Sequence, residues 1–444
     1  MTSHVYTRSR IGIVGSGIAG SSAAYFVQQE LGAEVCVFEA AAHVGGRIQE
    51  RTIAGVMVEQ GASLFHSSNR YLVHFVEMLG LHQQSTDATG TFGIWNGTSF
   101  DLTSSPSALL TKMKMLLRYG PTLLRVQQLV KNMVTRLTQI YARQEQGQAF
   151  STPEALFKAL DLYTLTQQQS DKYFRASNIS QRFLIEFVNG ASRNNYGQDS
   201  SINALVNLVS LAGAGMAGGS LYSVREGNNH VCQGLLRASN AIVRTDCRVQ
   251  QITRVSDTNG EGWELLLDSG ETERFDAVIV ATPFEGARIT VDERNLSSTA
   301  DIKRAYQTTH VTLVVGSLNP MYFGKKTHGE IPDDILTQEN PNIPFSSIGI
   351  VGNKDQPTST LYKLFSRKPL EETILTDLFA ERKQIEQWQW QAYPVLTPTT
   401  LWPPFQLSKG LYYINAMESA VSTMETEIIA SRNVVNLLKQ ESES

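Results

Sequence analysis

The sequence predicts an α/β protein that opens with a Rossmann-type dinucleotide-binding domain. Two observations near the amino terminus carry this prediction: a glycine-rich turn between a β-branched stretch and a helical one, and an acid at the end of the next apolar stretch. The composition agrees with it. The 444 residues, of which 41% are hydrophobic and 18% charged, suffice for two or three folded domains.

The first element is a strand, turn and helix in the run IGIVGSGIAGSSAAYFV. Residues 11–14 are predicted to form a buried strand and residues 21–29 a helix of small residues. The glycines between them permit a tight turn and the close approach of a pyrophosphate, to which the start of the helix offers N–H groups. Alone, the motif could be only a glycine-rich turn. The candidate cofactor contacts are Gly15, Gly17, Ile18, Ala19 and Gly20.

The second strand, AEVCVFEA, ends at Glu39 and Ala40. An acid about 20 residues beyond the glycine motif is expected to accept hydrogen bonds from a ribose diol. A carboxylate at a strand end can also be merely solvated, but two signals at this spacing are more specific than one. The sequence therefore predicts a bound dinucleotide.

The next stretches favour FAD over a nicotinamide cofactor. AAHVGGRIQE places Gly45, Gly46 and Arg47 beside the expected pyrophosphate, although Arg47 could also be a surface cation. VMVEQGASLFH is predicted as an alternating strand, and the small residues that follow it could lie with their backbone against a flat ring. These residues are Gly61, Ala62 and Ser63.

This succession resembles the flavoprotein superfamily that contains amine oxidases, carotene desaturases and GDP-dissociation inhibitors. Further stretches narrow the resemblance to the prenylcysteine oxidase family, and they extend over almost the whole chain. They include SRNNYGQDSSINALVNLVSLAGA, REGNNHVCQGLL, IVATP, SSIGIV and GLYYINAMESAVSTMETEIIASRN. The combination of NYGQ, VCQGLL and YYINAMES is far more specific than the dinucleotide motif.

The resemblance implies an amine-oxidase-like fold with a discontinuous Rossmann-type FAD-binding domain and an α+β substrate domain. The FAD-binding domain is expected to comprise residues 1–85, 222–290 and 400–444, and the substrate domain residues 86–221 and 291–399. In this family the strand of DCRVQQITRVS passes the adenine, so Val249 is a candidate backbone contact, or else an ordinary strand residue. Ala281, Thr282 and Pro283 end the last buried strand of the middle segment and are further candidates.

The carboxyl-terminal stretch is predicted to form the flavin end of the site. GLYYINAMES is interpreted as an apolar strand running into Glu418, a contact for the ribityl or phosphate region or only a solvated acid. The following helix is predicted to start with a capping box from Ser422 to Glu425. Its N–H groups would face the pyrimidine edge of the flavin, where negative charge develops on reduction. Ser422, Thr423 and Met424 are the candidate contacts.

The resemblance implies that the enzyme cleaves the thioether of farnesyl- or geranylgeranyl-cysteine by hydride transfer to flavin. The products would be cysteine, a prenyl aldehyde and, after reaction with oxygen, hydrogen peroxide. The cofactor performs the difficult step, and the protein positions the carbon that reacts. The expected partners are a small lipidated cysteine and oxygen, with no obligate protein partner.

Few residues are candidates for catalysis or substrate binding. His66 could assist the attack of water, or it could only hydrogen-bond its loop. Arg193, Asn195 and Tyr196 could meet the cysteine carboxylate or shape the pocket, and arginine is the best carboxylate partner among them. Aligned by eye, the flavin-facing lysine of many amine oxidases falls on Thr312, which weakens an amine oxidase interpretation.

A basic, apolar stretch suggests contact with a membrane. From Leu102 to Gln144 the sequence contains no Asp or Glu, and residues 106–145 are predicted to form amphipathic helices interrupted at Gly120-Pro121. Basic amphipathic helices favour anionic membrane surfaces, so a peripheral contact is expected. The alternative is that these are ordinary helices whose basic face meets water or acids elsewhere.

Other function classes are disfavoured. The net charge of −4 does not suggest nucleic acid as a partner, and three scattered cysteines suggest neither a disulfide framework nor a metal site. Without a recognisable signal peptide or membrane span, a cytoplasmic location is expected. A flavin enzyme acting on another isoprenoid, or a non-catalytic prenyl carrier of the same fold, remains an alternative function.

Overall fold

The computed structural model describes residues 9–85, 90–257, 260–292, 304–351 and 360–443, and its central sheet confirms the Rossmann-type prediction. Six strands lie in the order β10-β2-β1-β14-β22-β21, and all adjacent pairs are parallel except β21 with β22. The strands are β1 (Arg10–Val14), β2 (Glu34–Phe38), β10 (Ile242–Arg244), β14 (Ala277–Val280), β21 (Gln406–Ser408) and β22 (Leu411–Tyr413). Segments from the start, middle and end of the chain therefore form one sheet.

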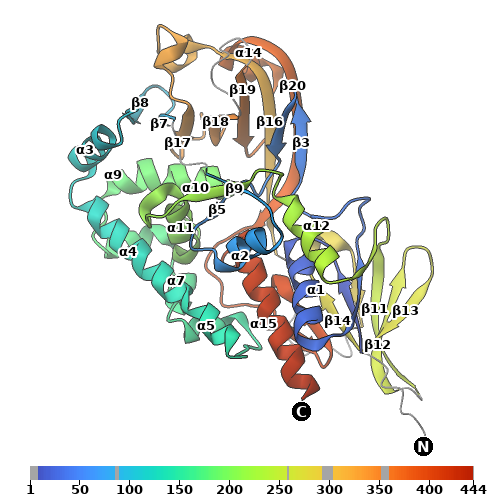
Figure 1. The fold of residues 1–444 in the computed structure, drawn as a ribbon. Coiled ribbons are helices and arrows are strands. Elements are labelled where there is room, and N and C mark those ends of the chain that lie inside the picture. Colours follow the sequence, from blue (N-terminus) through green and yellow to red (C-terminus); the bar gives the residue numbers. More distant parts are fainter. Residues whose placement is uncertain (1–8, 86–89, 258–259, 293–303, 352–359, 444) are drawn as a thin grey trace, which may run out of the picture.

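Three helices pack around this sheet, α1 (Ile18–Leu31), α12 (Asn229–Ala238) and α15 (Met424–Ser442). α1 follows β1 directly, and small residues such as Ala23 and Ala24 are completely buried. They let α15 approach closely, and the hydroxyl of Ser431 donates to the carbonyl of Ala19 (2.8 Å). In Figure 1 the first helix of the chain, in blue, lies beside the last, in red.

Smaller sheets border the central one. In the four-stranded sheet β13-β12-β11-β15, β12 pairs antiparallel with both β11 and β13. A two-stranded and a three-stranded sheet have the orders β3-β4 and β5-β9-β6. The strands are β3 (Glu50–Ile53), β4 (Val56–Glu59), β5 (Phe65–His66), β6 (Gln83–Ser85), β9 (Leu221–Val224), β11 (Val249–Asp257), β12 (Gly260–Leu267), β13 (Thr272–Phe275) and β15 (Thr290–Val291). Two short helices connect these regions, α2 (Arg70–Met78) and α13 (Phe284–Ala287).

A second large sheet has seven strands in the order β20-β16-β19-β18-β17-β7-β8. They are β7 (Phe92–Trp95), β8 (Phe100–Thr103), β16 (Tyr306–Leu318), β17 (Asp334–Thr337), β18 (Ser347–Val351), β19 (Thr360–Ser366) and β20 (Phe379–Pro394), with α14 (Glu372–Leu378) before β20 and 3₁₀ turns at Pro320–Phe323 and His328–Glu330. Figure 1 shows this sheet above the Rossmann-type part. One face packs on the β3-β4 hairpin through Leu313 and Ile53, and the other carries its own core around Trp95 and Tyr362.

Helices fill the remaining part of the molecule, on the left in Figure 1. They are α3 (Ala108–Tyr119), α4 (Thr122–Leu137), α5 (Gln139–Glu145), α6 (Pro153–Ala159), α7 (Tyr163–Gln167), α8 (Ser170–Ala176), α9 (Gln181–Phe183), α10 (Asn189–Tyr196) and α11 (Ala204–Leu211), with π-helical turns at Leu184–Val188 and Ala212–Met216. As predicted, the chain breaks between α3 and α4 at Gly120-Pro121. The side chain of Thr152 caps α6 by accepting from the Ala155 N–H (3.2 Å).

The two large sheets draw on the segments that were assigned to two domains, with β1, β2, β14 and β22 in one and β16 to β20 in the other. The boundaries themselves stay predictions, and the one between residues 85 and 86 falls at the edge of 86–89, outside the described residues. One expected strand is shorter than predicted. Only residues 411–413 of GLYYINAMES pair as a strand, and residues 414–417 turn as a 3₁₀ helix.

Candidate functional site

The glycine turn after β1 has no room for side chains. A Cβ on Gly20 would lie 1.9 Å from the carbonyl oxygen of Gly15, and Gly15 itself has a φ of +103° and lies against Ala281 and Thr282. No side chain caps α1 at Gly17. The first N–H groups of this 14-residue helix are therefore available to an anion, as in a pyrophosphate site.

Glu39 is held in position at the end of β2. Its Oε2 accepts from the N–H of Ser16 (3.0 Å) and from the Ser16 hydroxyl (2.5 Å), and its Oε1 accepts from the N–H of Ala41 (2.9 Å). The carboxylate thus lies beside the glycine turn, where a ribose diol would be bound. The chain leading to Val249 runs alongside, because the Cys247 N–H donates to the Glu39 carbonyl (2.9 Å).

The GGR motif packs directly on the glycine turn. Gly17 and Gly45 form a bridge, and the Gly45 N–H donates to the Ser16 carbonyl (3.1 Å). Gly45 has a φ of +116°, and a Cβ there would lie 2.2 Å from Oδ1 of Asn229. The two glycine-rich segments therefore form one cradle, with Gly46 next to Gly17 and Arg47 leading away from it.

Arg47 joins the two ends of the chain. Its guanidinium forms an ion pair with Glu418, whose side chain is fully buried, and donates to the carbonyl of Ala392 (2.8 Å). Glu418 also accepts from the hydroxyls of Tyr306 (2.9 Å) and Ser422 (3.0 Å). The amino-terminal GGR motif and the carboxyl-terminal MES motif thus meet at one point, together with β16 and β20.

A second arginine, Arg304, reaches the same cluster and was not singled out in the sequence. It bonds Oε1 of Glu285 (2.7 Å) and the Tyr413 hydroxyl (2.7 Å), and its Nη2 lies 3.9 Å from Glu418. Burial acts to raise the pKa of Glu418, but Arg47 and Arg304 outweigh it and hold that pKa below its usual range. Arg304 could not be identified from the sequence because it lies in no recognisable motif, and only the fold places it near Glu418.

A second buried acid adjoins this cluster. Burial, reinforced by the charge of Glu418, raises the pKa of Glu427 to about 8. Its Oε2 accepts from Asn415 Nδ2 (3.0 Å), while Oε1 is buried without a hydrogen-bond partner. The pair of acids therefore carries one negative charge near neutral pH, on Glu418.

The capping box predicted at the start of α15 was wrong by one residue. The cap is Thr423, whose hydroxyl accepts from the Thr426 N–H (3.1 Å), while the Thr426 hydroxyl accepts from the Thr423 N–H (2.9 Å). Ser422 turns to Glu418 instead, and Glu425 accepts from the N–H groups of residues 71 and 72 at the start of α2 (both 2.9 Å). The contacts of Ser422, Thr423 and Met424 with a flavin stay predictions.

The turn after β4 lies between the Rossmann-type part and the seven-stranded sheet. A Cβ on Gly61 would lie 2.2 Å from the ring of Trp390, and the Ala62 carbonyl accepts from Asn228 Nδ2 (2.6 Å). Ser63 donates to the Gly61 carbonyl (2.8 Å), and its Oγ lies 3.4 Å from Nζ of Lys363. The turn is thus covered by β19 and β20.

The comparisons with known proteins agree with this geometry. A model of an NAD(P)-binding Rossmann-like domain matches residues 13–79, which include the glycine turn and Glu39. The prenylcysteine lyase family model matches residues 102–444, far more than half of the chain. The chain belongs to the prenylcysteine lyase family.

Relatives from plants and animals resemble the chain along almost its whole length. It is 34% identical to farnesylcysteine lyase of Arabidopsis thaliana, covering 96% of this chain and 87% of that protein. It is 31% identical to prenylcysteine oxidase 1 of Bos taurus, covering 96% and 88% respectively. The protein is therefore an enzyme of this family, a flavin-dependent oxidoreductase.

Solved structures with the same fold have much lower identity. Cyclohexylamine oxidase from Brevibacterium oxydans aligns with a TM-score of 0.65 at 15% identity, covering 99% of this chain and 100% of that one. A fatty acid isomerase from P. acnes aligns with the same TM-score at 14% identity, covering 96% and 98%. These likenesses confirm the amine-oxidase-like fold.

Two ionisable residues near the Gly61 turn, Lys363 and Glu59, were not identified from the sequence. Nζ of Lys363 donates to the Glu59 carbonyl, and burial lowers the pKa of Lys363 to about 8 against the opposing effect of Glu59. Burial raises the pKa of Glu59 to about 7. A lone lysine in the apolar strand TLYKLFS was the available signal.

Lys363 and Thr312 lie on opposite faces of the sheet. Lys363 is paired with Leu313, which packs toward the β3-β4 hairpin, whereas Thr312 alternates to the other face. Gln387 donates to the Thr312 hydroxyl (3.2 Å). Lys363, which lies next to the Gly61 turn, is therefore on β19. Thr312, the position onto which the flavin-facing lysine of amine oxidases was aligned by eye, is on the neighbouring strand β16.

The substrate and catalytic candidates are dispersed. The guanidinium of Arg193 is buried and bonds Glu339 (2.6 Å) and Thr337 (2.9 Å), and Asn195 Nδ2 bonds the Ser210 hydroxyl (2.8 Å). The ring of Tyr196 packs edge-on against Tyr393 (4.9 Å between centroids), next to the carbonyl that Arg47 binds. Of these three, only Tyr196 is thereby brought toward the cluster of Arg47, Arg304 and Glu418, which we call the Arg47 cluster.

His66 engages its own loop. Its Nε2 donates to the Gly218 carbonyl (2.6 Å), so that Nδ1 accepts from the Ser68 N–H (3.1 Å). These contacts orient the ring without bringing it to the Arg47 cluster, and a role in water attack stays a prediction.

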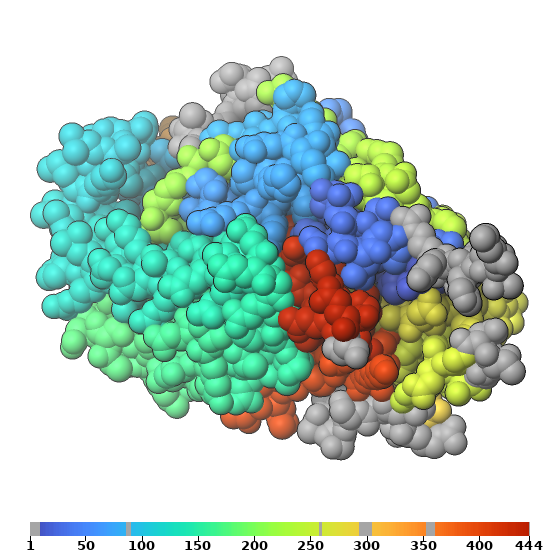
Figure 2. Space-filling model, turned by 60° about the horizontal axis from the view of Figure 1, so that its bottom comes forward, coloured from blue at the N-terminus to red at the C-terminus, as the bar shows by residue number. Residues whose placement is uncertain are grey.

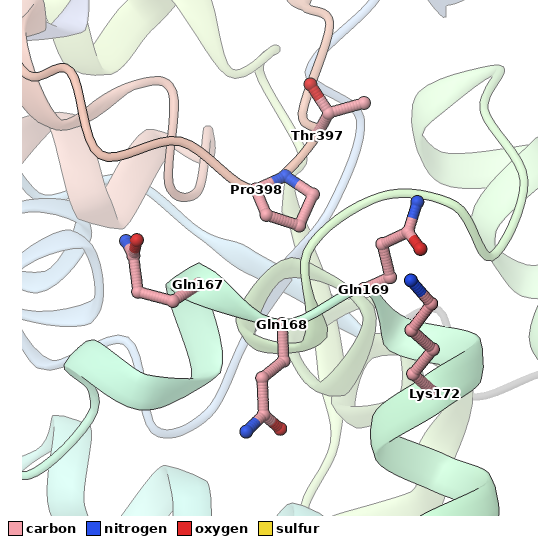
Figure 3. A pocket seen from close by; sticks show the side chains of 6 residues that line it. All are labelled: Gln167, Gln168, Gln169, Lys172, Thr397 and Pro398. Carbon is pink, nitrogen blue, oxygen red and sulfur yellow. The ribbon is translucent and has the colours of Figure 1, made fainter.

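The pocket in Figure 3 is separate from the predicted cofactor contacts. It has a volume of about 440 Å³ and lies between the end of α7, the start of α8 and the chain at Thr397-Pro398. Three glutamines and Lys172 line it. This polar lining does not suit a prenyl chain, and none of its residues is among the candidates for FAD or substrate.

Proposed function

We propose that the enzyme binds FAD and oxidatively cleaves the thioether of farnesyl- or geranylgeranyl-cysteine. Overall, the prenylcysteine, water and oxygen would give cysteine, the prenyl aldehyde and hydrogen peroxide. The family relationship over 96% of the chain carries this proposal. The names of the relatives supply the substrate class, and the structure contributes a site whose residues fit a dinucleotide.

Three features of the site support FAD. The glycine turn and Gly45 are packed so closely that a Cβ on Gly20 or Gly45 would clash, as expected of the tight turns of a pyrophosphate site. Glu39 is oriented for the ribose at one end. At the other end, Arg47 and Arg304 lie partly exposed beside the buried Glu418, so they could neutralise phosphate or hold Glu418 for a ribityl hydroxyl.

Bound FAD would supply a two-electron acceptor for the allylic carbon next to sulfur. The residues of this chain would bind and orient the cofactor and shield the reacting carbon from stray water. In this proposal, the buried ring of Tyr196 and the partly buried ring of Tyr393 shape the wall toward the cluster of Arg47, Arg304 and Glu418. Lys363, whose lowered pKa lets it exchange a proton near neutral pH, could hold a water at the Gly61 turn.

We also propose that residues 106–145 contact an anionic membrane surface peripherally. A prenylated substrate partitions to such a surface, which would concentrate it near the enzyme. Among the described residues, no helix combines the length and hydropathy needed to cross a membrane.

The decisive experiment is anaerobic mixing of the FAD-loaded enzyme with farnesylcysteine. Bleaching of the oxidised flavin band is expected, with one equivalent each of free thiol and aldehyde formed. A matched S-alkyl cysteine with a saturated chain of the same length should leave the band unchanged, because its carbon next to sulfur is not allylic.

Two outcomes would contradict the proposal. If farnesylcysteine and geranylgeranylcysteine both leave the band unchanged while another isoprenoid bleaches it, the substrate class is wrong. If the purified protein takes up no flavin at all, the prenyl-carrier alternative replaces the enzymatic one.

A further inference from the structure

The helix α3 exposes its apolar side chains instead of burying them. Five of them are between 50% and 84% exposed: Leu109, Leu110, Met113, Leu116 and Leu117. Monomeric proteins rarely expose contiguous apolar patches of this kind unless the patch binds something. We call these five residues the α3 apolar face.

Helix geometry places all five on one side. At about 100° per residue, positions 109, 113, 116, 117 and 110 fall within an arc of about 120°. Lys112 borders this arc on one side and Lys114 on the other, both exposed. An apolar stripe with lysines along its edges is the pattern of a helix that lies in a membrane interface.

The rest of α3 holds the helix to the protein. Met115 and Tyr119 are buried on the opposite side, and Arg118 forms two hydrogen bonds with Glu186 (2.6 and 2.7 Å). The Tyr119 hydroxyl also donates to Glu186 (2.9 Å). The α3 apolar face is therefore presented outward by a firmly attached helix.

The neighbouring helix α4 differs from α3 because it buries most of its apolar side chains. Its apolar residues Leu123, Val126, Val130 and Met133 are buried against the protein. The α4 surface carries mainly polar and basic side chains, apart from Leu124 next to the turn from α3. In Figure 2 the cyan residues of this part of the chain form the outer margin of the molecule on the left.

Charge decides which occupant fits the α3 apolar face. No acidic residue occurs between Leu102 and Gln144, so α3 and α4 carry no acid beside Lys112 and Lys114, the two lysines that border the α3 apolar face. Arg118 and Arg136 of these helices are instead paired with Glu186 and Asp161, which lie outside them. A uniformly basic rim around an apolar stripe complements the headgroups of anionic lipids. A second copy of the chain would instead bring two basic rims together.

We propose that α3 inserts its apolar face into the outer layer of an anionic lipid bilayer, with Lys112 and Lys114 at the headgroups. This assigns the membrane contact proposed above to one helix, and it leaves α4 and α5 outside the lipid. It is independent of the thioether chemistry, because no residue of α3 belongs to the predicted FAD or substrate set.

The attachment of α3 also connects the membrane to the site. Glu186 lies on the π-helical turn that continues into α10, and α10 ends at Tyr196. Ten residues of helix span about 15 Å. A membrane-bound α3 would thus hold one end of the helix whose other end carries Tyr196 and its contact with Tyr393.

The test is sedimentation of the full-length FAD-loaded enzyme with vesicles, measured without substrate. Vesicles of phosphatidylcholine with phosphatidylserine should bind the protein at low salt, and pure phosphatidylcholine vesicles should bind it at least ten-fold more weakly. The double substitution Leu109→Asp and Leu117→Asp should weaken binding at least ten-fold. The matched control is Met321→Asp, an equally exposed apolar residue outside the basic segment, which should change nothing.

The insertion of α3 into the lipid can be tested separately with the variants Leu117→Trp and Met321→Trp. Only the first should lose fluorescence with vesicles of brominated lipid. Turnover of dispersed farnesylcysteine without vesicles should be the same in all variants, so failure of membrane binding and failure of the proposed reaction are distinguishable.

Three results would overturn the proposal. The first is no binding to anionic vesicles. The second is binding that the double aspartate variant leaves intact. The third is a concentration-dependent dimer, seen by light scattering, that the same variant abolishes, because the α3 apolar face would then be covered by a second copy.

Discussion

Gly20 is the residue at which the glycine turn is most tightly constrained. Because a Cβ would lie 1.9 Å from the Gly15 carbonyl, the substitution Gly20→Ala must push the turn away from α1. We expect at least a ten-fold loss of FAD affinity, measured as the flavin-to-protein ratio after dialysis. Gly213→Ala is the control, since nothing lies within 4 Å of its Cβ position. Equal flavin retention by both variants would refute the assignment of the turn.

Glu427 makes the stability of the cofactor-free protein depend on pH. Its folded-state pKa of about 8 lies above the usual value of 4.5, so its contribution is complete at low pH and is lost as the pH rises through 8. Glu427→Gln mimics the neutral form and avoids that loss. As the pH rises from 5 to 8.5, we expect the parent to lose about 1–3 kcal/mol of its free energy of unfolding through this carboxyl group. The variant should not show this loss.

Urea titrations at several pH values would measure the difference in free energy of unfolding between the parent and the variant. A difference that stays constant across the range would show that Glu427 is not held neutral, and that Glu418 does not share one charge with it.

At the residue scale, the sequence could identify the groups that follow a local rule. Gly15, Gly20 and Glu39 are defined by spacing within one βαβ unit, and the structure brings them together. Arg304 and Lys363 could not be identified in this way, because their surroundings come from strands distant in the chain.

At the element scale, the start of α15 shows the limit of a motif. The string Ser422-Thr-Met-Glu425 satisfies the capping-box pattern. The box that forms joins Thr423 to Thr426, which does not match that pattern because its third residue is neither Glu nor Gln. Glu418 takes the hydroxyl of Ser422, and the start of α2 takes the carboxylate of Glu425. A pattern within one helix cannot reveal such competing partners.

The cap at Thr423 leads to a testable prediction for the stability of α15. Thr423→Ala should destabilise the protein by about 1 kcal/mol, because the Thr426 N–H loses its acceptor. Thr423→Ser keeps the hydroxyl and should retain most of the stability, as measured by thermal and urea unfolding. If both substitutions cost the same, the methyl packing of Thr423, and not the cap, stabilises this end of α15.

At the scale of the whole molecule, the Rossmann-type half could be predicted from local patterns, whereas the substrate half was expected from the family resemblance. Segments 11–14, 34–38 and 277–280 are apolar strands with turn signals, and they pair as parallel neighbours. The contact between the halves has no such local pattern. It depends on Arg47 reaching Ala392 and Glu418, and on Trp390 covering Gly61, which only the folded chain specifies.

This arrangement predicts that FAD stabilises both halves together, whereas ADP acts on one. FAD at 100 times its dissociation constant should raise the free energy of unfolding by about 2.7 kcal/mol. In hydrogen exchange, FAD should protect peptides covering 11–20 and 34–47 at the nucleotide end. It should also protect those covering 304–313 and 411–428 at the flavin end, of which 304–313 belongs to the second half. ADP would occupy only the proposed nucleotide end, beside Glu39, and should protect only the first pair. If FAD protected no more than ADP, the cluster of Arg47, Arg304 and Glu418 would not be the flavin end of the site, and the two halves would be joined by protein contacts alone.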